Sequence, residues 1–173
     1  MLLSVVMQMP DPTELFVYGT LRHDQPEHAR YCRGVVGWQP ARLFGRLFRI
    51  REGYRLLVLP PQAILVRASP AAGLDEQRRR ALSPAELADA AARLLRTGGG
   101  WIRGELLRFA DAAEAWPPLD AWEGTSTHGD SIYARIVVPV EQPDGSGLFV
   151  PAWVYGAVEP PAGAVEIEPA AAS

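Results

Sequence analysis

Two neighbouring segments near the end of the chain, residues 131–140 and 148–157, constrain the fold more than any other feature. In the first segment apolar residues recur at every second position, which is the period of a β-strand with one buried face. These residues are Ile132, Ala134, Ile136, Val138 and Val140. Pro143-Asp144-Gly145 lies between the segments and is typical of a tight turn. The pair therefore predicts a β-hairpin.

Further short segments have the composition of strands. They are residues 15–18, 41–51, 54–59 and 101–109, and the middle two flank the turn Glu52-Gly53. Fewer segments have helical character, chiefly residues 26–31 and 83–96. Because strands outnumber helices and occur in hairpins, we expect an α+β fold around a mixed, mostly antiparallel sheet or barrel of about six strands.

The first of these strands ends in a loop with the features of a binding site. Residues 15–18 are apolar or aromatic, and Gly19 then ends the run. A glycine permits positive φ and has no Cβ to keep a ligand from the amides of Gly19, Thr20 and Leu21. Successive backbone N–H groups in a turn can bind an anion. The loop therefore predicts a carboxylate or phosphate site, and the alternative is an ordinary turn.

Composition excludes several functional classes. The 17 basic and 20 acidic residues give a net charge of −3, so we expect no nucleic-acid partner. The single cysteine, Cys32, excludes a disulfide framework within the chain. The three histidines show neither HxH nor HExxH spacing, so we predict no metal site, and we interpret His23 and His28 as surface residues.

The length of 173 residues favours one domain. We assign residues 1–13 to an N-terminal leader that is too short to span a bilayer, and residues 158–173 to a flexible tail rich in proline, alanine and glutamate. The domain proper is predicted to span residues 14–157. We expect a cytoplasmic protein with no membrane partner.

Residues 60–100 differ from the rest because they are rich in alanine, arginine and proline, and they predict an inserted helical segment. Ser83 and Glu86 form a capping-box pattern at the start of its helix, residues 83–96. We expect residues 69–80 to be an exposed connection. This helix has three alternative interpretations: a lid over the barrel mouth, an addition on the outside of the barrel, or a helix that docks a partner. The docking interpretation requires an exposed stripe of Leu87, Ala91, Leu94 and Leu95.

Three motifs in this order resemble the γ-glutamylcyclotransferase-like family, including its small bacterial members and the γ-glutamylamine cyclotransferases. They are Phe16-Val17-Tyr18-Gly19-Thr20-Leu21, Leu119-Asp120-Ala121-Trp122-Glu123-Gly124 with Tyr133-Ala134-Arg135, and Ala152-Trp153-Val154-Tyr155. The strands around Gly45 and Gly104 are also similar to that family. The resemblance covers about residues 14–59 and 101–157.

The resemblance implies a closed six-stranded barrel with flanking helices and a reaction that needs no metal or organic cofactor. A γ-glutamyl amine or amino acid would be cyclised to 5-oxoproline with release of the amine. Tyr18, Gly19, Thr20 and Leu21 would form the substrate loop, and Glu123 would be the catalytic acid/base. The implied partner is a small γ-glutamyl molecule, and we expect a monomer or weak homodimer.

Other polar residues have more than one interpretation. Arg22 and Tyr133 are candidate substrate-binding residues, and the Tyr133 hydroxyl could orient Glu123, although a solvated arginine and a packed strand aromatic are the alternatives. Glu105 is a rival carboxylate for the pocket, Asp120 a helix cap, and Arg135 a surface or salt-bridge residue. The competing functional reading is a catalytically silent barrel that binds a small carboxylate or a protein partner.

Overall fold

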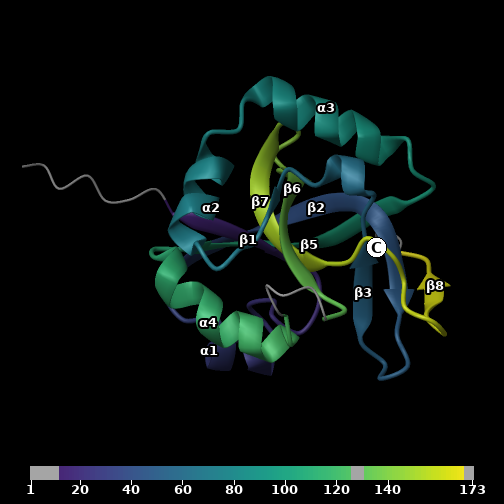
Figure 1. Ribbon diagram of the computed structural model, residues 1–173, viewed down its shortest axis with the longest axis horizontal. Helices are drawn as coiled ribbons and strands as arrows, with labels where there is room; N and C mark the ends of the chain where they lie inside the picture. The colour runs from purple at the N-terminus through teal and green to yellow at the C-terminus, as the bar shows by residue number, and fades with distance from the viewer. Residues whose placement is uncertain (1–11, 126–130, 170–173) are drawn as a thin grey trace, which may run out of the picture.

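The computed structural model describes residues 12–125 and 131–169 and contains a closed β-barrel (Figure 1). Its strands are β1 (Thr13–Val17), β2 (Val35–Arg49), β3 (Arg55–Val58), β4 (Val66–Arg67), β5 (Gly100–Phe109), β6 (Ala134–Glu141), β7 (Phe149–Gly156) and β8 (Val165–Ile167). The ring runs β2-β5-β1-β7-β6 and returns to β2. Only the β1–β7 pair of this ring is parallel. The predicted α+β fold with a mixed, mostly antiparallel barrel is therefore confirmed.

The ring contains five strands where the resemblance implied six. The first part of β2 pairs with β5, and β6 meets β2 at Arg42 and Glu141, whose side chains form an ion pair there. The remaining part of β2 extends past this point and pairs with β3 on one edge and β8 on the other. These two strands thus enlarge the sheet without entering the ring.

The β6–β7 hairpin is confirmed, but both of its faces are buried. Ile136 and Val138 contribute to the core cluster inside the barrel, as the alternation predicts. On the outer face Val137 and Trp153 belong to a second cluster that includes Trp116 and Leu119 of a helix. A helix that covers the outer face explains why the alternation of apolar and polar residues is incomplete in β7.

Four α-helices flank the described barrel, together with the 3₁₀ turn η1 (Pro61–Ala63). They are α1 (Pro26–Tyr31), α2 (Ala72–Arg80), α3 (Pro84–Leu95) and α4 (Ala112–Glu123). The α4 helix continues through Pro117 and Pro118, although proline disfavours a helix interior. Each proline removes a backbone hydrogen-bond donor from the helix. The flanking residues Ala115, Trp116 and Leu119 are buried, and their packing keeps the helix intact.

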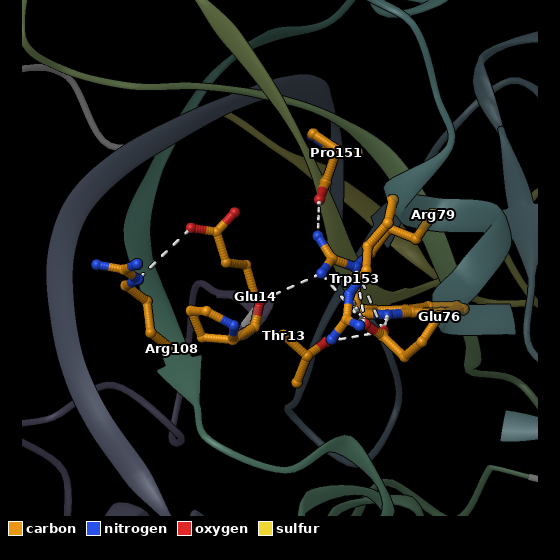
Figure 2. A network of polar contacts seen from close by, with 9 residues as sticks. Thr13, Glu14, Glu76, Arg79, Arg108, Pro151 and Trp153 are labelled. Atoms are coloured by element: carbon orange, nitrogen blue, oxygen red, sulfur yellow. Dashed lines mark hydrogen bonds and ion pairs between the residues drawn. The ribbon is translucent and has the colours of Figure 1, made fainter. Parts of the chain in front are cut away.

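The α2 helix replaces the exposed connection expected at residues 69–80, and a buried ion pair attaches it to the barrel. Figure 2 shows Glu76 of α2 beside Thr13 and Trp153, which both donate hydrogen bonds to its carboxylate. Arg79 pairs with Glu76 at 3.1 Å and donates to the carbonyl of Pro151 at 3.0 Å. Because Thr13 is buried in β1, it belongs to the domain and not to the expected leader, whose residues 1–11 lie outside the described part.

The α3 helix packs on its own barrel. Its capping box is present, and Leu87, Ala91 and Leu94 are buried, whereas Leu95 is exposed. The stripe required by a partner-docking helix is thus covered within the chain, which makes that reading wrong. In Figure 1 α3 lies across the top of the barrel, and α1 and α4 lie at the lower left.

Part of the predicted tail is a strand. β8 pairs with Leu47 to Arg49 of β2, and Glu166 forms a bidentate ion pair with Arg46 at 2.7 and 2.9 Å. The sequence analysis missed this strand because its three residues include only a weak apolar pattern. No helix among the described residues is long and apolar enough to cross a membrane.

Candidate functional site

A pocket of about 690 Å³ opens where β1 ends. Its wall comes from residues 16–22, the hairpin turn at residues 53–55, the last turn of α4, and the side chains of Tyr133 and Tyr155. Each predicted site residue lines it: Tyr18, Gly19, Thr20, Leu21, Arg22, Glu123 and Tyr133. No residue of the inserted segment 60–100 belongs to the described wall, so the position of α3 does not support a lid.

The loop after β1 supplies hydrogen-bond donors but no positive φ. Gly19 is absent from the described glycines with positive φ, so that part of the prediction is wrong. A Cβ placed on Gly19 would meet no atom within 4 Å, so its missing side chain keeps space open. The N–H groups of Gly19, Thr20 and Leu21 donate to no described carbonyl outside the strands and helices. An anionic ligand group in the pocket could accept from such donors.

Glu123 enters the pocket because α4 ends there. It is the last residue of the helix, and Gly124 ends it with a left-handed φ of 62°. Asn and glycine adopt this conformation most easily, which explains a glycine at this position. Burial raises the pKa of Glu123 from 4.5 to about 7. A carboxyl with such a pKa can both accept and donate a proton near neutral pH.

The charge of Glu123 acts on weak acids from three parts of the chain. Burial raises the pKa of Tyr133 and of Cys32 to about 12 each, and the Glu123 charge adds to both increases. Burial and the same charge hold the pKa of Tyr18 well above its ordinary value. These groups therefore stay neutral at physiological pH, and Glu123 is the group that titrates there.

The tyrosine hydroxyls of the pocket are bound to the backbone. The Tyr133 hydroxyl donates to the carbonyl of Arg55 at 2.8 Å, so it fixes the hairpin and does not orient Glu123 as expected. The Tyr18 hydroxyl donates to the carbonyl of Tyr155 at 2.9 Å and accepts the N–H of Leu57 at 3.1 Å. Both side chains thus shape the wall of the pocket.

Asp120 and Arg135 form an ion pair beside the pocket, in which Arg135 is buried and Asp120 is partly exposed. This is the salt-bridge alternative predicted for Arg135, whereas Asp120 was assigned to a cap. Arg135 donates to both Asp120 oxygens, at 3.0 and 3.3 Å, and its side chain is 3% exposed. The Tyr155 hydroxyl also donates to Asp120, at 2.6 Å. No sequence signal reveals this arrangement, because the three residues come from α4, β6 and β7.

Arg22 lines the pocket as predicted. Its Nη2 lies 3.6 Å from Asp24, and its Nε is buried without a hydrogen-bond partner among the described residues. Tyr54 and Arg55 from the hairpin also line the pocket, and the sequence analysis did not select them. The turn itself was predicted, but only the tertiary structure brings it to the end of β1.

Glu105 lies outside the pocket, so its role as a rival carboxylate is wrong. It is buried on β5 and accepts the backbone N–H of His23 at 2.8 Å, and its other oxygen lies 2.6 Å from His23 Nδ1. Together with Asp24, these two residues form a group of three potential metal ligands among the described residues. Their potential ligand atoms lie within 4.8 Å of one another. Since both Glu105 oxygens already contact His23, these contacts attach the loop after β1 to β5. The absence of a metal stays a prediction.

Comparison with known proteins identifies one family. The family described as γ-glutamyl cyclotransferase, AIG2-like, matches residues 15–88. None of the curated proteins gives a significant match. The crystal structure of YkqA from Bacillus subtilis has 19% identity and a TM-score of 0.47, and the similarity covers 84% of this chain and 36% of YkqA. The crystal structure of an AIG2-like protein from Mus musculus has 18% identity and a TM-score of 0.49, over 87% of this chain and 81% of the mouse chain.

Proposed function

Since this chain belongs to the γ-glutamylcyclotransferase-like, AIG2-like family, we propose that it is an enzyme that cyclises a γ-glutamyl group. Its substrate would be a γ-glutamyl amine or γ-glutamyl amino acid, and its products 5-oxoproline and the released amine. The matched stretch ends at residue 88, before Glu123 and Tyr133, so their roles rest on the geometry of the pocket. The observation that carries the proposal is a half-buried carboxyl, with a pKa of about 7, in the same pocket as the glycine loop.

The first step of the proposed reaction requires a base. At neutral pH the substrate α-amine is an ammonium group, which has no lone pair to attack the γ-carbonyl carbon. Glu123 accepts one proton from this ammonium, and the amine nitrogen then forms the new C–N bond of a five-membered ring. Because the pKa of Glu123 is about 7, its carboxylate is a competent base at this pH.

The same group completes the reaction. The tetrahedral intermediate collapses when the original amide C–N bond breaks, and protonated Glu123 returns its proton to the leaving nitrogen. The ring nitrogen loses its second proton to the released amine, which leaves as an ammonium ion, so Glu123 ends as the carboxylate with which it began. No water, metal or redox step enters this balance. Among the described residues of the pocket wall Glu123 is the only carboxylate, so it is the candidate for both transfers.

Substrate positioning falls to the loop after β1. An intramolecular attack is fast when the reacting atoms are held close, so the main task is to fold the substrate toward a ring. The N–H groups of Gly19, Thr20 and Leu21 are suited to hold the α-carboxylate, and Arg22 lies next to them. Tyr133 and Tyr18 close the wall around that group.

The test is release of 5-oxoproline from a panel of γ-glutamyl amines, γ-glutamyl dipeptides and glutathione. We expect turnover of at least one substrate by the wild type and a loss of about 10²-fold or more in Glu123→Gln. Binding of that substrate to the variant, measured by calorimetry, should persist. The matched control is Glu114→Gln, which makes the same change at an exposed position of the same helix and should keep wild-type turnover.

Two results would overturn the proposal. Equal turnover in Glu123→Gln and wild type would exclude Glu123 as the acid/base. Tight binding of γ-glutamyl compounds or 5-oxoproline without turnover of any substrate would identify a carboxylate-binding barrel and not an enzyme.

A further inference from the structure

Two side chains from outside the loop after β1 hold the peptide groups on either side of Arg22. The carbonyl of Leu21, in the peptide group before Arg22, accepts a hydrogen bond from Nδ1 of His28 in α1 at 2.9 Å. The N–H of His23, in the peptide group after Arg22, donates to the carboxylate of Glu105 in β5 at 2.8 Å. The loop is thus attached to a helix on one side of Arg22 and to the barrel on the other.

The backbone groups of Arg22 itself are also bonded. Its N–H donates to the carbonyl of Gly19 at 3.3 Å, and its carbonyl accepts the N–H of Gln25 at 2.9 Å. All four polar groups of the two peptide bonds that flank Arg22 therefore have a hydrogen-bond partner. This bonding fixes the point from which the Arg22 side chain leaves the backbone.

Glu105 contributes to this arrangement through His23. It is 8% exposed, and its second oxygen lies 2.6 Å from Nδ1 of His23. The His23 ring stacks on Trp38 of β2, with ring centres 3.6 Å apart and an interplanar angle of 10°. Burial of a carboxylate is costly unless hydrogen bonds compensate it. Both Glu105 oxygens meet this need at His23, so the carboxylate connects the barrel to the loop.

The Arg22 side chain keeps donors for a ligand. It lines the pocket beside the amides of residues 19–21, and its Nε is buried without a hydrogen-bond partner among the described residues. Its Nη2 lies 3.6 Å from Asp24, which is longer than a hydrogen bond. Arginine binds a carboxylate through two parallel N–H donors. The open donors of Arg22 are therefore suited to a carboxylate in the pocket.

We propose that Glu105 is a positioning residue, which holds the loop after β1 so that Arg22 presents its guanidinium to a carboxylate of the bound substrate. Glu105 is not part of the described pocket wall, so it acts through the N–H of His23 and not on the substrate. His28 supports the loop from the other side. The proposal deepens the function proposed above, and only the identity of the substrate rests on that function.

The first experiment measures the motion of Arg22 without any ligand. The {¹H}–¹⁵N NOE of its backbone N–H and its side-chain Nε–H is compared in full-length wild type, Glu105→Leu and Glu105→Gln. The Nε–H signal is assigned by its absence in Arg22→Gln. Glu105→Leu removes the acceptor of the His23 N–H and should lower both NOE values. Glu105→Gln keeps an oxygen that can accept this N–H and should retain the wild-type values.

The second experiment is a double-mutant cycle on KM. Its substrate is the γ-glutamyl compound that the wild type turns over fastest in the panel above. Arg22→Gln and Glu105→Leu should each raise KM by about tenfold, because each removes the contact of Arg22 with the substrate. The double variant should also show about a tenfold increase, since one contact is lost only once. Glu105→Gln should restore the wild-type KM.

The control is Glu141→Leu, which removes a carboxylate of similar exposure on β6, outside the described pocket wall. The side chain of Glu141 is 13% exposed against 10% for Glu105, and it pairs with Arg42. This variant should keep the Arg22 motion and the KM of the wild type. Circular dichroism establishes that each variant is folded. If Glu105→Leu does not fold, Glu105→Thr takes its place, because threonine suits a strand and its side chain is two bonds shorter.

Two results would overturn the proposal. Unchanged NOE values of Arg22 in a folded Glu105 variant would show that the carboxylate does not hold this residue. Increases in KM that multiply to about a hundredfold in the double variant would show that Glu105 acts independently of Arg22. Absence of turnover in every protein would instead contradict the proposed function, and the NOE values would then decide the role of Glu105.

Discussion

The hydroxyl of Tyr18 accepts the backbone N–H of Leu57 at 3.1 Å, although the two residues lie 39 positions apart. The same hydroxyl donates to the carbonyl of Tyr155 at 2.9 Å, so one side chain connects the end of β1 to β3 and β7. Since β3 follows the hairpin turn at residues 53–55, this contact helps to set the width of the pocket. A residue selected as a substrate contact thus also holds the walls together.

Tyr18→Phe should therefore lower stability. The change removes the hydroxyl and leaves the N–H of Leu57 without that partner, at a cost of about 1–3 kcal/mol in the free energy of unfolding. Urea denaturation at pH 7 provides the measurement. Tyr54→Phe, at a tyrosine that is 56% exposed, should change this free energy by less than about 0.5 kcal/mol. Equal effects of the two substitutions would show that the Tyr18 hydroxyl contributes nothing.

Glu123→Gln should stabilise the protein at high pH and not at low pH. The pKa of Glu123 is about 7 in the folded state against 4.5 when it is fully solvated, so ionisation opposes folding. The contribution of protonated Glu123 to wild-type stability is present below pH 4.5. It is lost as the pH rises through 7, which lowers the free energy of unfolding by up to about 3 kcal/mol. Glutamine has no charge and avoids this loss.

Urea denaturation of both proteins at pH 5 and pH 8.5 tests the sign. The variant should be more stable at pH 8.5, and the difference at pH 5 should be only about a quarter as large. A constant difference between the two proteins at both pH values would mean that Glu123 titrates with an ordinary pKa.

Arg79→Met should strongly destabilise the attachment of α2. Glu76 would keep the hydrogen bonds from Thr13 and Trp153 but would lose its buried counter-charge (Figure 2). Removing one partner of a buried ion pair typically costs about 3–5 kcal/mol. Thermal unfolding measures the loss. Arg78→Met changes the neighbouring arginine, whose side chain is 60% exposed, and should have little effect. Similar losses in both variants would argue against a special role for the buried pair.

Two glycine-to-alanine substitutions should distinguish a glycine that close packing requires from a glycine that borders open space in the pocket. A Cβ on Gly104 would lie 2.2 Å from the carbonyl oxygen of Val17 and 2.7 Å from the Phe16 ring, so Gly104→Ala must displace β1. We expect the free energy of unfolding, measured by chemical denaturation, to fall by about 1–3 kcal/mol. Gly19→Ala meets no atom within 4 Å and should be neutral in stability. A large loss of stability in Gly19→Ala would contradict the open space assigned to that position.

Local patterns predicted the elements whose signals lie close together in the chain. The capping box at Ser83, the α1 helix and the β6–β7 hairpin all depend on neighbouring residues, and the structure confirms them. Patterns failed where packing from distant segments outweighs local preference. Pro117 and Pro118 stay helical because buried neighbours hold them, and β8 forms because β2 offers an edge.

The sequence by itself determined that the chain folds as an α+β barrel, which family it resembles, and several of the residues that line the pocket, because alternation, glycine positions and short motifs are local properties. Tertiary structure alone decided the state of those residues. The pKa of Glu123 depends on how deeply it is buried at the end of α4, and Glu105 lies outside the pocket, where both of its oxygens contact His23. The Asp120–Arg135 pair exists only where α4 meets β6. Burial and long-range pairing arise from contacts between distant segments, so no local pattern encodes them.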